Sequence, residues 1–89
     1  MPEIRFTYAI QRHVPCPARN VMGATVREAL DRYFADNERA RSYFLDERGA
    51  MRHHVVVFVD GRSVADRTGL ADPVAPNGVI DVMQALSGG

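Results

Sequence analysis

The chain opens with a run in which apolar side chains occupy every second position. The apolar members of this run are Ile4, Phe6, Tyr8 and Ile10. A repeat of two over this length predicts a half-buried strand that spans residues 3–11. Pro15 and Pro17 then interrupt the pattern, because proline cannot donate a hydrogen bond to a central sheet ladder. A short returning strand over residues 20–24 would complete an opening hairpin.

From Thr25 the apolar positions recur every three or four residues, which predicts a helix. Thr25 and Glu28 form a capping box, in which each side chain can accept a hydrogen bond from a free backbone amide at the helix start. The apolar stripe that follows consists of Val26, Ala29, Leu30, Tyr33 and Phe34. The charged residues between them, Arg27, Glu28, Asp31 and Arg32, are expected to face water.

Asp36-Asn37 is expected to end this helix. Residues 38–45 predict a second, shorter helical turn, and residues 46–49 predict a loop. The apolar side chains that this second turn would bury are Tyr43, Phe44 and Leu45.

Residues 55–59 (Val-Val-Val-Phe-Val) form a continuous apolar run, which favours a central strand with apolar side chains on both faces. Asp60-Gly61 is a strong signal for a tight turn, and residues 62–65 can form the returning strand. An irregular segment follows, and a turn at Asn77-Gly78 leads into a last strand over residues 79–84. If Val57 and Val59 face the helix, Val56 and Phe58 must face the open side of the sheet.

The element order is therefore β-β-α-β-β-β, with a final strand that can pair beside the first. These are the elements of an α+β, β-grasp (ubiquitin-like) fold, in which a mixed sheet of four or five strands packs on one main helix. We expect residues 1–84 to form this domain and residues 85–89 to form a flexible C-terminal tail. The expected core contains Val26, Leu30, Phe34, Val57, Val59 and Val82.

The sequence ends on Gly88-Gly89, directly after the last predicted strand. Glycine makes up about 7% of average sequence, so such an end arises by chance in roughly 0.5% of chains. A frayed end is one interpretation. The chemical interpretation is that an end without Cβ atoms can enter a narrow enzyme channel and deliver an unhindered carboxylate.

The composition excludes several functional classes. The 11 acidic and 11 basic residues balance, so the chain lacks the positive charge of a nucleic-acid-binding protein. No apolar run reaches the length of a membrane span, and the single cysteine fits a reducing compartment, so cytoplasm is the expected location. All 11 basic residues are arginine, which leaves no side-chain amine to accept an isopeptide bond.

Few side chains carry the spacing of a catalytic or metal site. His13, His53 and His54 lack zinc-site spacing, so we expect no metal and no cofactor-binding residues. Cys16, between two prolines, is expected to be an exposed loop residue. A docking surface for a partner is expected at the root of the tail, formed by Val56, Phe58, Met83, Leu86, Ser87 and Gly88. The alternative is that a loop covers Phe58.

Taken together, the motifs resemble the MoaD/ThiS family of ubiquitin-like sulfur-carrier proteins. The resemblance covers nearly the whole chain and rests on the following segments: the strand 4–10, the capped helix from Thr25, the block 51–64, Gly69-Leu70-Ala71-Asp72-Pro73 and Ser87-Gly88-Gly89. The long connection before residue 55 is most similar to that of CysO-type carriers. One departure is Asn77-Gly78-Val79, where the family usually has Asp-Gly-Asp.

The resemblance implies a carrier that catalyses nothing itself. A ubiquitin-activating-like adenylyltransferase would use ATP to adenylate Gly89, and a sulfur donor would convert the adenylate to a thiocarboxylate for an acceptor enzyme. In this family such a carrier also serves as the small subunit of a synthase, for example molybdopterin synthase. The resemblance further implies a free monomer without a permanently bound cofactor, and ATP and zinc belong to the partner.

Two further functions are compatible with the same sequence. A ubiquitin-like modifier would be joined through Gly89 to target lysines, and a simple interaction module would not use the tail at all. The acceptor pathway, whether molybdopterin, cysteine, thiamin or a related one, is left open.

Overall fold

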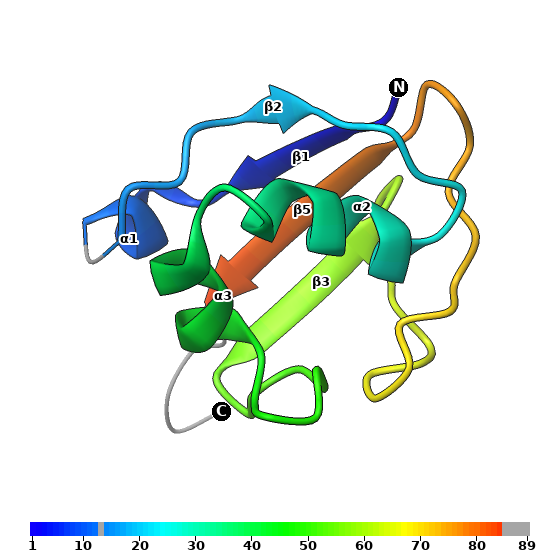
Figure 1. Cartoon of the computed structure of the whole chain (residues 1–89). Coiled ribbons are helices and arrows are strands. Elements are labelled where there is room, and N and C mark those ends of the chain that lie inside the picture. Colours follow the sequence, from blue (N-terminus) through cyan, green and yellow to red (C-terminus); the bar gives the residue numbers. More distant parts are fainter. Residues whose placement is uncertain (13, 85–89) are drawn as a thin grey trace.

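A computed structural model of the chain describes residues 1–12 and 14–84, without the side chains of residues 8 and 9. The sheet has five strands in the order β2-β1-β5-β3-β4, and α2 and α3 cover one of its faces (Figure 1). The elements are β1 (Glu3–Phe6), α1 (Tyr8–Gln11), β2 (Arg19–Asn20), α2 (Val26–Phe34), α3 (Glu38–Phe44), β3 (Val55–Val59), β4 (Arg62–Ser63) and β5 (Val79–Gln84). β1 and β5 run parallel and the other pairs are antiparallel, which confirms the expected mixed sheet.

The capping box of α2 is present in a shifted form. The backbone amide of Glu28 donates to Thr25 Oγ1 at 3.2 Å, as expected. The carboxylate of Glu28 accepts from the backbone amide of Ala24, at 2.9 Å, rather than from that of Thr25. Two of the free amide groups near the helix start are satisfied in this way, so the local sequence is sufficient to define where α2 begins.

The expected core is confirmed. Leu30 and Phe34 of α2 are almost fully buried against Val57 and Val82 of the sheet, and Val59 is partly buried against the same cluster. An aromatic group joins the sheet to both helices, because the ring of Phe6 lies 5.0 Å from that of Tyr33 and 5.1 Å from that of Phe44. Phe44 and Leu45 are buried, as expected for the second helix, whereas Tyr43 is only partly buried.

The first strand is shorter than predicted, because the chain leaves the sheet after Phe6. The Thr7 amide donates to Val82 O at 3.2 Å, and Thr7 O then accepts from the amides of Ile10 (3.1 Å) and Gln11 (3.2 Å). This turn forms α1. Ile10 is nevertheless fully buried, in the same hydrophobic core cluster as Phe6, even though the strand has ended.

The second strand is also displaced from the predicted residues 20–24. β2 pairs Asn20 with Glu3 and Arg19 with Ile4, and it contains no further residue. The chain then packs tightly against α2, because a Cβ atom at Gly23 would lie only 2.7 Å from the Ala29 backbone nitrogen. Contact with the helix replaces further strand pairing.

The turn between β3 and β4 follows the sequence prediction. Asp60 and Gly61 both have positive φ, at 49° and 85°, which is the backbone of a type I′ hairpin turn. β4 is shorter than the predicted residues 62–65, since only Arg62 and Ser63 pair with β3. The Asp60 side chain also accepts from the Val79 amide at 2.8 Å, which ties this turn to the start of β5.

Cys16 is buried, which corrects the expectation of an exposed loop residue. Its side chain is only 1% exposed, and its Sγ donates to Val14 O at 3.1 Å. The segment between β1 and β2 packs over the core next to Tyr33, whose hydroxyl donates to Pro17 O at 2.6 Å. The flanking prolines therefore shape a covering segment of the core.

Candidate functional site

The apolar side chains on the open face of the sheet come from its two central neighbours, β3 and β5. Val57 and Val82 point to the helices and are 1% exposed. Because side chains alternate along a strand, Val56, Phe58 and Met83 point to the opposite face, where each is half-buried. We call these three residues the open-face patch. Phe58 is neither fully covered nor fully exposed.

Strand register brings the patch together next to the end of β5. Val56 lies directly opposite Met83, and Val55 lies opposite Gln84, the last residue of the strand. Directly opposite side chains in an antiparallel pair have Cβ atoms about 4.5–5.5 Å apart, so Val56 and Met83 form one surface. Residues 85–89 follow Gln84 in the sequence, so the patch lies beside the end of the described part of β5.

An ion pair borders the patch on the β1 side. Arg5 donates two hydrogen bonds to the Asp81 carboxylate, from Nε at 2.8 Å and from Nη2 at 3.1 Å. Asp81 lies directly opposite Phe58 in the β3–β5 register. The Asp81 hydrogen bond and charge raise the pKa of Arg5 above its ordinary value. The open face therefore combines an apolar centre with an oriented, partly exposed ion pair.

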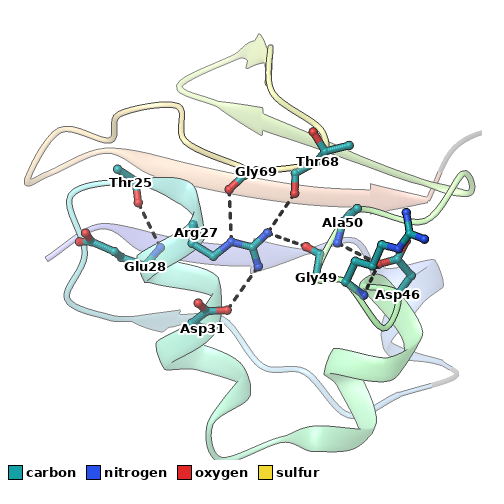
Figure 2. Close-up of polar contacts among 10 residues, drawn as sticks. Thr25, Arg27, Glu28, Asp31, Asp46, Gly49, Ala50, Thr68 and Gly69 are labelled. Atoms are coloured by element: carbon teal, nitrogen blue, oxygen red, sulfur yellow. Dashed lines mark hydrogen bonds and ion pairs between the residues drawn. The ribbon is translucent and has the colours of Figure 1, made fainter.

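The Arg27 side chain holds two loops against α2 (Figure 2). Its Nη2 donates to Gly49 O at 2.6 Å and to Thr68 O at 3.1 Å, and its Nε donates to Gly69 O at 3.2 Å. Asp31, one turn later, lies 3.6 Å from Nη1. Arg27 was expected to face water, and the structure instead places it between the helix and these loops.

Each of the two loops also has its own internal aspartate. Asp66 accepts hydrogen bonds from the amides of Gly69 and Thr68, and Asp46 accepts from those of Arg48 and Ala50. These bonds stabilise the ionised carboxylates and hold the pKa of each aspartate below its usual value. The loops are thus fixed by backbone contacts.

A further arginine fixes the start of β3, next to the end of β5. The Arg67 Nη2 atom donates to Val55 O at 2.7 Å and to Arg52 O at 3.0 Å. Val55 pairs with Gln84, the last residue of β5, so this contact anchors β3 next to the end of β5. Arg67 therefore holds the start of β3 in place beside the end of β5.

Within residues 1–12 and 14–84, no group of three or more histidine, cysteine or acidic side chains is arranged to hold a metal ion. In the same residues, no helix is long and apolar enough to cross a membrane. His54 packs edge-on against the Tyr43 ring, with centroids 5.1 Å apart.

The structure brings together three of the predicted site residues, Val56, Phe58 and Met83. Leu86, Ser87, Gly88 and Gly89 lie outside the described residues. Sequence reasoning missed the Arg5–Asp81 pair and the role of Arg27. The ion pair could have been found from the expected parallel pairing of the first and last strands, which places residues 5 and 81 side by side.

Comparison with known proteins places the fold. No protein-family model and no curated protein sequence matches this chain. Among solved structures, SAMP1 from Haloferax volcanii is 23% identical with a TM-score of 0.76, and the match covers 99% of this chain and 98% of that one. CysO from Mycobacterium tuberculosis, described as an antigen, is 16% identical with a TM-score of 0.80, covering 97% and 100% of the two chains.

A third similar structure is that of the BexX/CysO complex of Amycolatopsis orientalis. The matched chain is 21% identical with a TM-score of 0.75, and all of both chains is covered. These similarities span whole chains, and they confirm the β-grasp, ubiquitin-like fold. They also agree with the CysO-type resemblance that the sequence motifs suggested.

Proposed function

We propose that this chain is a sulfur-carrier protein whose reactive group is the carboxylate of Gly89. The observation that carries the proposal is the position of Gly88-Gly89, four and five residues after β5, the central strand that contributes Met83 to the open-face patch. The fold shared with CysO supports the same function. The patch lies at the end of β5 that precedes residues 85–89 in the sequence, so we propose that one partner contacts both.

In this proposal, the folded domain binds the partner and residues 85–89 carry the reactive carboxylate into the partner's active site. Five extended residues span about 16–18 Å, so Gly89 could reach a buried site while the open-face patch remains against the partner's surface. Ordering the tail costs roughly 1–2 kcal/mol per residue, which contacts made by the patch must offset. An aromatic side chain such as Phe58, half-buried in the free protein, is the kind that supplies such contacts when a partner covers it.

The proposed chemistry takes two steps, and both occur in the active site of the partner enzyme. The Gly89 carboxylate attacks the α-phosphorus of ATP, and pyrophosphate leaves to give an acyl adenylate. Sulfide then attacks the carbonyl carbon, and AMP leaves to give a thiocarboxylate. ATP is a substrate of the partner adenylyltransferase, so the carrier requires no resident cofactor or catalytic side chain. The thiocarboxylate would pass to an acceptor enzyme.

The second candidate is a ubiquitin-like modifier that is joined through Gly89 to lysine side chains of other proteins. The similarity to the small archaeal modifier protein 1 from Haloferax volcanii, over 96% of this chain, favours it. Both functions begin with the same adenylate and differ in the nucleophile that attacks it.

The test combines the chain with a ubiquitin-activating-like enzyme of its own organism, ATP and sulfide. Intact-mass spectrometry should show the exchange of one oxygen for sulfur at the C-terminus. Conjugates of higher mass with added target proteins, in place of this exchange, would indicate the modifier function.

Two variants make the test specific to the glycines. Deletion of Gly89 should abolish loading, because it leaves the carboxylate about 3.5 Å short of the attacking position. Gly88→Val should fail as well, since a β-branched residue restricts the backbone and widens the tail. Ala85→Ser, which alters neither the length nor the glycines and lies outside the expected docking residues, is the matched control. Equal loading of wild type and the Gly89 deletion would show that the carrier proposal is wrong.

A further inference from the structure

Amine nucleophiles are missing from the side chains of this protein. Activated carboxyl groups in proteins are attacked by amines, thiolates and, when a base activates them, hydroxyl groups. All 11 basic side chains are arginine, and the guanidinium group stays protonated at physiological pH. No side chain in these 89 residues can therefore form an amide bond with an activated carboxyl group.

The one thiol is withdrawn from solvent. Cys16 is 1% exposed, and its Sγ is held against Val14 O at 3.1 Å. Burial raises the pKa of the Cys16 thiol to about 11. Since the thiolate is the nucleophile, geometry and protonation both keep this cysteine from reacting.

The phenol of Tyr33 is withdrawn in the same way. Its side chain is 1% exposed, and its hydroxyl donates to Pro17 O at 2.6 Å. Burial raises the pKa of Tyr33 to about 12. Serine and threonine hydroxyls need an adjacent base to become nucleophiles. Histidines form only transient acyl adducts, which water hydrolyses.

We propose that the chain is built as a pure acyl donor, whose own side chains do not accept its activated carboxyl end. This inference rests on the proposed function, because it concerns Gly89 once that carboxylate has been activated. An adenylate or thioester at Gly89 would persist until a partner presents the intended sulfide, thiol or amine. If the chain acts as a modifier, no side chain of one unit can accept a second unit through an amide bond, which leaves the α-amino group as the single amine of the chain.

The reaction that the chain avoids is aminolysis between two copies. In a thioester, an amine nitrogen attacks the carbonyl carbon, the carbon–sulfur bond breaks, and the thiol leaves with the proton. The product is an amide-linked dimer. Hydrolysis competes and returns the carboxylate and the same thiol.

The test uses the full chain with Gly89 converted chemically to an aryl thioester, so that no activating enzyme is involved. Arg39 is exposed on α3, and no described hydrogen bond or ion pair involves its side chain. Arg39→Lys adds one amine and keeps the charge, while Arg39→Gln removes the charge and adds no amine. All three proteins share the same α-amino group, so a difference in dimer yield between them is due to the side chain at position 39.

At pH 8, wild type and Arg39→Gln should give mainly hydrolysed chain. Arg39→Lys should give at least about tenfold more side-chain-linked dimer, with the new amide mapped by peptide mass to position 39, while dimer linked through the shared α-amino group should be equal in all three proteins. Side-chain-linked dimer from wild type at the level of Arg39→Lys would overturn the inference. Failure of the enzymatic loading assay would instead contradict the proposed function and leave this comparison unchanged.

The thiol is tested separately with an aromatic disulfide reagent, 5,5′-dithiobis(2-nitrobenzoate). The comparison protein is the double variant Cys16→Ala/Ser63→Cys, which moves the thiol to an exposed position on β4. Cys16 in the folded protein should react on the order of 100-fold more slowly than this surface thiol, and at a normal rate in urea. Equal rates in the folded proteins would overturn the inference.

Discussion

Phe58 and Asp81 lie directly opposite each other in the antiparallel β3–β5 pair, so an apolar ring and an ion-paired carboxylate share the open face of the sheet. Val57 and Val82, one position away on each strand, are buried under the helices. On each of the two strands, neighbouring side chains therefore lie on opposite faces, one in the core and one on the open face.

The first prediction concerns this separation. Phe58→Ala should weaken binding to the activating enzyme while lowering the melting temperature only slightly, because a half-buried side chain on the open face gives up little core burial. Val57→Ala is the matched control on the same strand, and it should lower the free energy of unfolding by on the order of 2 kcal/mol. Calorimetry of binding and thermal unfolding of both variants would check this. A large loss of stability in Phe58→Ala with unchanged affinity would contradict it.

The second prediction concerns the core contact of α2. Leu30 is 2% exposed at the centre of the helix. Leu30→Ala should lower the free energy of unfolding by about 2–5 kcal/mol, a large part of the stability of a small domain. Urea denaturation measures the change. An effect well below 1 kcal/mol would mean that Leu30 does not pack as the structure describes.

The third prediction concerns the loops that Arg27 holds. Arg27→Met keeps an unbranched side chain of helix-forming type and removes all three hydrogen bonds to Gly49, Thr68 and Gly69. Hydrogen bonds from charged groups contribute about 1.5–3 kcal/mol each when buried, and partial exposure reduces this, so we expect a total loss of about 1–3 kcal/mol.

Hydrogen exchange provides the local measurement for Arg27. The amides of residues 66–71 should exchange faster in Arg27→Met, whereas Arg32→Met, an exposed position on the same helix, should leave them unchanged. Equal protection in both variants would show that the loops are fixed without Arg27.

The fourth prediction concerns alkaline pH. Burial raises the pKa of the Cys16 thiol to about 11, above the value of about 8.5 for a thiol in the unfolded chain. A raised folded-state pKa contributes stability that is present below pH 8.5 and is lost as the pH rises toward 11. Across that window this group should reduce the free energy of unfolding by up to about 1.4 kcal/mol per pH unit.

Urea denaturation at pH 7, 8.5 and 10 tests the alkaline effect. Cys16→Ala should reduce the slope between pH 8.5 and 10, although it lowers stability at pH 7 by removing a buried side chain. Tyr33 titrates higher, at a pKa of about 12, so its contribution to this window is small. An unchanged slope in Cys16→Ala would mean that Cys16 is not buried as the structure shows.

The sequence by itself determined those parts of the protein that depend on neighbours in the chain. The Thr25 cap, the apolar stripe of α2, the Asp60-Gly61 turn and the run from Val55 to Val59 are local patterns, and each correctly predicted its element. Alternation also placed Phe58 and Val57 on opposite faces, because the side-chain repeat of a strand is fixed by the backbone. The fold class followed from the order of these elements.

The tertiary structure alone decided the features that depend on distant contacts. Burial of Cys16 requires the loop between β1 and β2 to pack beside Tyr33, and the bonds of Arg27 require loops some 20 and 40 residues away. β1 ends at Phe6 because its pairing with β5 ends at Val82. The alternating pattern of residues 3–11 continues past Phe6, so it does not predict this end. These outcomes depend on which surfaces meet in three dimensions, and local propensity carries no information about distant partners.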